Sequence, residues 1–270
     1  SKGFFKREGL DVKGRMFTSG PSCAEALIYG NAVFGTMGDT TTIISLSKNC
    51  KRFCAICSHG GGENRHRIIV RKDSGIERPQ QLEGMRIGVK KGTSTHGGLM
   101  LFARKNGLDL KEEIMDIKPS LQLTALAAGQ LDAMVASEPT PTQAEANGIG
   151  RQLRTLGGLD NGYPIFILVN RGFALENPET VVKFLKAIKH AAAYVQRQPD
   201  EAAAILSGIT GLEKSVMRKA MANHYYHVKL DRNTIESVNT MAKFLKSINK
   251  VKSELDVDEC LDDRYLKMIE

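Results

Sequence analysis

The segment Ala26–Asn31 (ALIYGN) recurs in this chain as Ala125–Gln130 (ALAAGQ), 99 residues later, from position 26 to position 125. At the same spacing, Gly38–Thr41 (GDTT) corresponds to Ser137–Thr140 (SEPT). Each copy is typical of a helix that a glycine ends, followed by a short apolar strand and then by an acidic residue close to a hydroxyl residue. Two copies of one helix–strand–acid unit predict two similar lobes with a ligand cleft between them.

The composition indicates a globular protein that buries a substantial core, in one large domain or two of ordinary size. The chain has 270 residues, of which 41% are hydrophobic and 25% are charged. No apolar run approaches the roughly 18–20 residues that a membrane-spanning helix needs. The net charge of +8 fits either solubility alone or attraction of anionic ligands or membrane surfaces. Nucleic-acid binding is disfavoured because the basic residues are scattered and no basic run is interleaved with aromatic residues.

Strand and helix patterns alternate over most of the first 170 residues, which predicts the α/β class with mainly parallel sheets. Strands are expected at residues 15–18, 32–37, 52–58, 67–71, 85–89, 113–118 and 165–169. Helices are expected at residues 21–29, 40–48 and 98–105, and as a helical tail from residue 176 onward. Residues 1–9 read as the end of a helix, so we expect a first strand and most of a first helix before Ser1.

Several segments in this order carry a resemblance to a known family. They are Gly3–Val12, Asp73–Ile76, Leu82–Val89, Gly92–His96, Gly129–Ala133, Ser137–Pro139, Asn177–Glu179 and Gln198–Ala202. With these segments the chain resembles the periplasmic substrate-binding proteins of ABC importers. The most similar branch is the NMT1/THI5-like one, which includes binders of aliphatic sulfonates, nitrate and thiamine precursors.

The resemblance implies a type II periplasmic-binding-protein-like fold, in which two α/β lobes joined by two crossing strands close on a ligand by hinge motion. Lobe one is expected at 1–75 plus 170–270, lacking its first strand, and lobe two at 76–169. The implied protein is a monomeric receptor that passes a small molecule to the membrane permease of an importer, without a cofactor. Its expected location is the periplasm, or the cell exterior with a membrane anchor, with a signal segment that this chain does not contain.

Two hydroxyl-rich loops, each between a strand and a helix, are candidate ligand contacts. One contributes Gly92, Thr93, Ser94, Thr95 and His96, and the other contributes Ser19, Gly20 and Ser22. Hydroxyl groups and the free N–H groups of a first helical turn donate hydrogen bonds to an anion. The alternative is that these residues only cap their helices.

The repeated acidic residues are further candidates, with their neighbours Gly38 and Thr40. Asp39 and Glu138 are expected at matching strand ends, where they either bind a ligand amine or cap a helix. His59 lies in the glycine-rich segment Ser58–Gly62 and is a candidate donor or a solvated loop residue.

The spacing of Cys50, Cys54 and Cys57 matches the cluster-binding cysteines of radical enzymes that use S-adenosylmethionine. Here the segment reads as a strand, so Cys54 and Cys57 are expected on opposite faces, and buried free cysteines behave as small apolar residues. We therefore expect packing roles and no metal site.

The leading functional interpretation is a receptor for a small oxyanion-bearing molecule such as an alkyl sulfonate, since hydroxyl-rich helix starts and positive charge favour it. One alternative is an enzyme on the same fold that resembles the fungal thiamine-pyrimidine synthase. Another is the ligand-sensing domain of a signalling protein.

Overall fold

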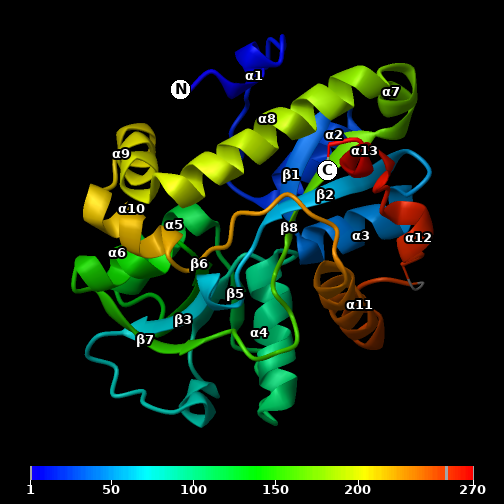
Figure 1. Cartoon of the computed structure of the whole chain (residues 1–270). Helices are drawn as coiled ribbons and strands as arrows, with labels where there is room; N and C mark the ends of the chain where they lie inside the picture. Colours follow the sequence, from blue (N-terminus) through cyan, green and yellow to red (C-terminus); the bar gives the residue numbers. More distant parts are fainter. Residues whose placement is uncertain (1, 253–254, 270) are drawn as a thin grey trace.

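The computed structural model describes residues 2–252 and 255–269, in which two β-sheets form (Figure 1). The first sheet has the strand order β1 (Phe34–Gly38), β8 (Ile165–Asn170), β2 (Phe53–Gly60). The second sheet has the order β5 (Ile114–Asp116), β4 (Ile87–Val89), β6 (Ala133–Ser137), β3 (His66–Arg71), β7 (Gly150–Thr155).

All strands but one in each sheet run in the same direction. In the first sheet, β1 and β2 are both antiparallel to β8, which lies between them. In the second sheet, β4 is parallel to β5 and β6, whereas β3 is antiparallel to β6 and β7. The predicted α/β class with mainly parallel strand directions is therefore confirmed, and the two exceptions are the strands that follow a crossing between the sheets.

The helices pack on both faces of the sheets. They are α1 (Phe4–Arg7), α2 (Gly20–Ile28), α3 (Asp39–Asn49), α4 (Ser94–Lys105), α5 (Pro119–Ala127), α6 (Thr140–Ala146), α7 (Arg171–Glu176), α8 (Pro178–Arg197), α9 (Pro199–Thr210), α10 (Lys214–Met221), α11 (Arg232–Ser247), α12 (Val257–Cys260) and α13 (Arg264–Lys267). Two short 3₁₀ helices are η1 (Glu63–Arg65) and η2 (Pro79–Leu82). The expected helical tail is thus present from α7 onward.

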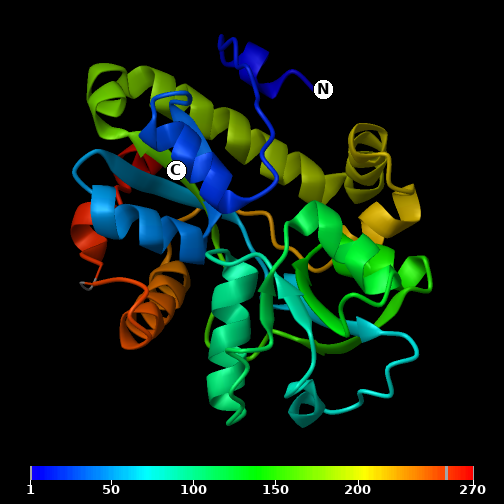
Figure 2. The same cartoon turned by 180° about the vertical axis from the view of Figure 1, so that it is seen from behind.

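Alternation along β8 divides the core of the first sheet into two layers. Phe166 and Leu168 pack in the cluster that includes α2, α3 and α11, whereas Ile167 and Val169 pack on the opposite side with α8. This is the period of two that a strand buried on both faces requires. Figures 1 and 2 show α8 on one face of this sheet and α2 and α3 on the other.

The repeat at a spacing of 99 residues is confirmed as a repeated structure. In the first copy α2 is followed by Gly30 and β1, and in the second copy α5 is followed by Gly129 and β6. Gly30 has φ 73° and Gly129 has φ 68°, a left-handed conformation that glycine adopts without a steric penalty. The two copies belong to different sheets, as the repeat predicted.

The crossings between the sheets lie earlier in the chain than the boundaries at 75/76 and 169/170 that the sequence suggested. β3 already pairs in the second sheet, and all of β8 pairs in the first. The chain therefore crosses within residues 61–65 and again within 156–164. The turn-rich stretch near Gly75 is the loop that leaves β3. The division into two hinged lobes stays a prediction.

Two expected elements differ from the structure. Residues 15–18 form no strand, because the free edge of β1 has no ladder partner among the described residues. Helix α4 begins at Ser94 and not at residue 98, since Gly97 and Gly98 lie inside the helix despite the low helix propensity of glycine. Tertiary packing overrides propensity at these two glycines, as both are buried.

The positions of the cysteines also differ from those expected from the sequence. Cys50 and Cys260 form a disulfide that joins the end of α3 to α12. Cys54 and Cys57 lie on the same side of β2, in the cluster with α8, because a register shift between Ala55 and Cys57 interrupts the alternation. Within residues 2–252 and 255–269, no group of three or more histidine, cysteine or acidic side chains is placed to hold a metal ion. Nor does the same part of the chain contain a helix of the length and apolar character that a bilayer span requires.

Candidate ligand-binding cleft

A cleft of about 440 Å³ lies where the first turns of several helices meet. Its walls include the starts of α2, α3 and α4, the end of β6 and the residues that enter β3. These elements come from both sheets, so the cleft lies between the two halves of the molecule.

Arg65 contributes a positive charge to the lining of this cleft. Arg65 is the last residue of η1, at the first crossing between the sheets, and it is only 6% exposed. Its Nη1 donates to Ser137 Oγ at 3.0 Å, and its Nε has no hydrogen-bond partner. Among the described residues no carboxylate forms an ion pair with it. Burial lowers the pKa of Arg65 to about 10, which the nearby Asp39 carboxylate opposes, so the guanidinium stays charged at neutral pH.

Most of the buried polar atoms without a partner belong to residues that line this cleft, or to Thr40 next to the lining residue Thr41. In the described part of the chain, five of the six such side-chain atoms belong to Thr40, Arg65, His66 and Ser94. Leaving one such group unpaired costs about 1–3 kcal/mol, and native proteins contain few of them. Their concentration in one place therefore indicates a site that binds a polar ligand.

The start of α4 adds further donors. Thr93 is the N-cap residue of α4, and its hydroxyl bonds to the Lys90 carbonyl oxygen and the Thr95 hydroxyl and not to a backbone N–H of the helix. The N–H groups of the first turn therefore have no side-chain cap, and the helix dipole favours negative charge at this end. Thr93, Ser94 and Thr95 all line the cleft.

The structure brings together six of the residues that the sequence predicted for the site. Those that line the cleft are Gly20, Gly38, Thr93, Ser94, Thr95 and Glu138. Those that do not line it are Ser19, Ser22, Asp39, Thr40, His59, Gly92 and His96. Sequence reasoning missed Arg65, His66 and Ser137, which line the same cleft.

Several of the residues outside the cleft have local partners that explain them. The Asp39 carboxylate accepts from Thr40 N at 2.6 Å and from Asn161 Nδ2 at 2.7 Å. The Ser19 and Ser22 hydroxyls bond to each other. These contacts lie at the helix starts and are not side-chain N-caps, because neither α2 nor α3 has a side-chain capping hydrogen bond.

The two candidate histidines are also held away from the cleft. His59 Nε2 bonds to Thr36 Oγ1 at 2.6 Å in a separate small apolar pocket between β1 and α8. His96 Nδ1 accepts from Gly92 N–H at 3.4 Å. Desolvation lowers the pKa of each histidine to about 4, so both rings are neutral near pH 7.

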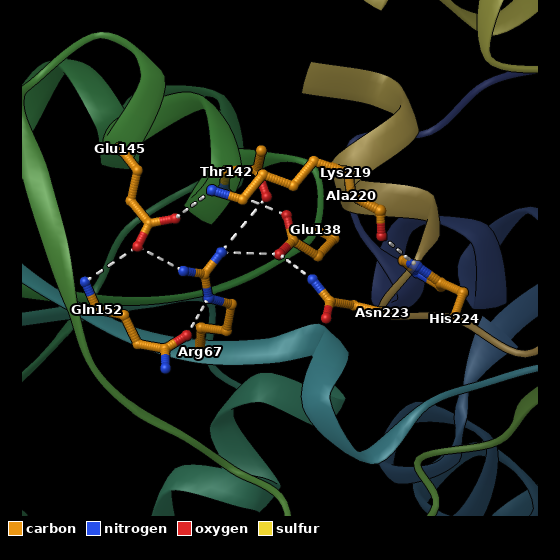
Figure 3. A network of polar contacts seen from close by, with 9 residues as sticks. All are labelled: Arg67, Glu138, Thr142, Glu145, Gln152, Lys219, Ala220, Asn223 and His224. Carbon is orange, nitrogen blue, oxygen red and sulfur yellow. Dashed lines mark hydrogen bonds and ion pairs between the residues drawn. The ribbon is translucent and has the colours of Figure 1, made fainter. Parts of the chain in front are cut away.

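Glu138 lines the cleft, and its carboxylate is held in a network of polar contacts (Figure 3). Oε1 accepts from Arg67 Nη1 at 3.0 Å and from Asn223 Nδ2 at 2.9 Å, and Oε2 accepts from Thr142 N at 3.2 Å. Arg67 also pairs with Glu145 at 2.6 Å. Both oxygens of the Glu138 carboxylate thus already accept hydrogen bonds from protein groups.

Replacing Glu138 by glutamine is expected to lower the free energy of unfolding by about 2–3 kcal/mol, because a buried charge-assisted hydrogen bond is lost. The cost stays below that of an isolated buried charge, since Glu145 still pairs with Arg67. Urea unfolding of Glu138→Gln, compared with the exposed Glu236→Gln as control, measures it. A stability equal to that of the control contradicts the structural role.

The comparisons with known proteins assign the family. The NMT1/THI5 like family model matches residues 1–202, so the chain belongs to this family. It is 27% identical over 266 residues to the "Putative aliphatic sulfonates-binding protein" of Bacillus subtilis (strain 168), covering 97% of this chain and 80% of that protein. It is 26% identical over 199 residues to the taurine-binding periplasmic protein of Escherichia coli (strain K12), covering 73% of this chain and 61% of that one.

Solved structures confirm the periplasmic-binding-protein fold. The alkanesulfonate-binding protein SsuA from Xanthomonas axonopodis pv. citri, bound to MOPS, matches with a TM-score of 0.88 at 22% identity, covering 96% of this chain and 90% of that one. The desulfurization enzyme DSZB matches with a TM-score of 0.73 at 17% identity, covering 99% and 93%. The fold therefore occurs in both binding proteins and an enzyme, and the sequence relatives support a solute-binding role.

Proposed function

We propose that this protein is the solute receptor of an ABC importer and that it holds a small alkyl sulfonate by its anionic head. The observation that carries the proposal is the buried Arg65 guanidinium, which lines the cleft without a carboxylate partner. A buried charge is costly unless it is paired. An anionic ligand supplies that partner when it binds.

The groups around Arg65 match the three oxygens of a sulfonate. Ser94 and the first-turn N–H groups of α4, together with Ser137 at the end of β6, supply hydrogen-bond donors to the cleft. Exclusion of water from a closed cleft strengthens each of these contacts, because the effective dielectric constant falls. Phe17, Pro119 and Pro139 line the remaining wall and offer apolar contacts for a short alkyl chain.

The engagement of the acidic groups narrows the ligand class. The oxygens of Glu138 and Asp39 already accept hydrogen bonds from protein groups. An ammonium group on the ligand would therefore compete with protein donors for these carboxylates. This favours ligands with one negative charge and an uncharged chain over zwitterions.

We expect simple alkanesulfonates to bind with micromolar affinity, equivalent to about −8 kcal/mol, and taurine to bind at least about tenfold more weakly. Titration calorimetry with methane-, ethane-, propane- and butanesulfonate, taurine, nitrate and an aminopyrimidine tests this, and mass spectrometry shows whether the ligand is recovered unaltered. Binding of the pyrimidine alone overturns the sulfonate proposal, and equal affinity for taurine overturns the role of the engaged acids. Turnover of the ligand would favour the enzyme alternative.

The proposed location is the periplasm or the cell exterior, with the importer's membrane permease as partner and the receptor acting as a monomer. The Cys50–Cys260 disulfide supports this, because disulfides persist in oxidising compartments. The receptor role is favoured over an enzyme because the free cysteines, Cys23, Cys54 and Cys57, are all buried outside the cleft. Burial raises the pKa of each thiol, which disfavours a thiolate nucleophile.

A further inference from the structure

Helices α3 and α4 meet in a seam beside the cleft, although they belong to different halves of the molecule. α3 packs on the strands of the first sheet, and α4 packs on β6 and β3 of the second. Figure 2 shows the first turn of α4 reaching the start of α3. The seam is defined here by Gly38, Thr40 and Thr41 on one side and Gly92, Ser94 and Gly97 on the other.

The two sides of the seam touch without intervening side-chain bulk. Thr41 Oγ1 donates to the Gly92 carbonyl oxygen at 2.9 Å, a hydrogen bond that joins the two halves directly. A Cβ atom on Gly38 would lie 2.1 Å from Ser94 Oγ. A Cβ atom on Gly97 would lie 2.4 Å from Thr40 Oγ1 and 3.3 Å from Thr40 Cγ2. Distances this short require one side of the seam to move.

The position of Thr40 decides which part moves. Its side chain is fully buried and β-branched, so it has little freedom to change rotamer. Met241 Sδ, at 3.1 Å from the same Cβ position, belongs to a flexible side chain that can move aside. A methyl group at position 97 therefore presses on Thr40 and separates the two helix starts.

The seam also holds two of the unpaired polar atoms beside the ligand site. Thr40 Oγ1 and Ser94 Oγ are buried without a partner, and Ser94 lines the cleft. We propose that the glycine seam sets how closely the two halves approach, and that Gly97 is a positioning residue whose missing side chain allows the cleft to close on its ligand. This rests on the proposed receptor function, and it concerns a residue that does not itself line the cleft.

Gly97→Ala tests the seam because its methyl group cannot block the ligand directly. The matched control is Gly208→Ala in α9, where a Cβ atom meets nothing within 4 Å. Both variants gain the helix propensity of alanine. We expect Gly97→Ala to bind the tightest alkanesulfonate of the panel at least about tenfold more weakly, the typical result of overpacking. Its radius of gyration from small-angle scattering in saturating ligand should exceed that of Gly208→Ala, which should match the wild type.

A second variant distinguishes the proposed effect of Gly97→Ala from a folding defect. Gly97→Ala combined with Thr40→Ala removes the two Thr40 atoms that the new methyl group meets and leaves only the flexible Met241 side chain beside it, so this variant should regain the wild-type radius of gyration and most of the affinity. Equal affinity and equal compaction of Gly97→Ala and Gly208→Ala overturn the inference, as does a double variant that regains neither. If the wild type binds no sulfonate, the receptor proposal fails on its own. In that case the role of the seam is tested by small-angle scattering of the ligand-free proteins. A larger radius of gyration for Gly97→Ala than for the wild type supports the role, and identical scattering curves overturn it.

Discussion

Replacing Arg65 by methionine is expected to weaken sulfonate binding by about a hundredfold or more. Truncation of one partner in a buried, hydrogen-bonded charge pair costs about 2–5 kcal/mol, and Arg65 is the buried cation of the cleft. The ligand-free variant should unfold at the same temperature or higher, because methionine removes a buried charge that has no carboxylate partner in the free protein. Calorimetry gives the affinity and differential scanning gives the midpoint.

Two further variants separate charge from geometry in this experiment. Arg65→Lys keeps the charge but loses the planar fork, so it should bind more weakly than the wild type and more tightly than Arg65→Met. Arg71→Met, at the end of the strand β3 that follows Arg65 and paired with Asp73 outside the cleft, should bind as the wild type does. Unchanged affinity in Arg65→Met would remove Arg65 from the site and with it the observation that carries the receptor proposal.

The part of the site that was predictable from the sequence is the part that local chain geometry determines. A run of hydroxyl residues before a helix places donors at its first turn wherever the helix packs, and Thr93, Ser94 and Thr95 do line the cleft. The repeat likewise predicted matching strand ends, because a helix, a glycine and a strand form one continuous local unit. The fold class followed from the alternation of strand and helix patterns along the chain.

Arg65 was not predictable, because nothing in its neighbourhood separates it from the other basic residues among the 38 in the chain. Its importance comes from burial and from the lack of a carboxylate partner, and both depend on segments distant in sequence. Glu138 shows the reverse case, since Arg67 and Asn223, which engage its carboxylate, are 71 and 85 residues away. An acidic residue at a strand end was visible in the sequence, but its partners were not.

Removing the Cys50–Cys260 disulfide is the second change with a large expected effect. The bond closes a loop of 210 residues, for which the chain-entropy model gives about 5 kcal/mol, and native disulfides typically contribute 2–5 kcal/mol. It also fixes the C-terminal segment on the edge of β2, where Asp262 N donates to Ala55 O at 2.9 Å and Tyr265 is buried against the sheet. We therefore expect Cys50→Ala/Cys260→Ala to lose about 3–5 kcal/mol, or roughly 10 °C in Tm.

A reductant separates the loss of the bond from the loss of side-chain packing. Dithiothreitol should lower the Tm of the wild type toward that of the double variant and leave the double variant unchanged. Cys23→Ala, which alters a buried free cysteine, should keep the full response to reductant. Thiol titration of the denatured wild type should find three free thiols before reduction and five after it, because the remaining two are in the disulfide. Five thiols in the unreduced protein, with a Tm insensitive to reductant, would contradict the presence of the disulfide. They would also remove the support that the disulfide gives to a location in an oxidising compartment.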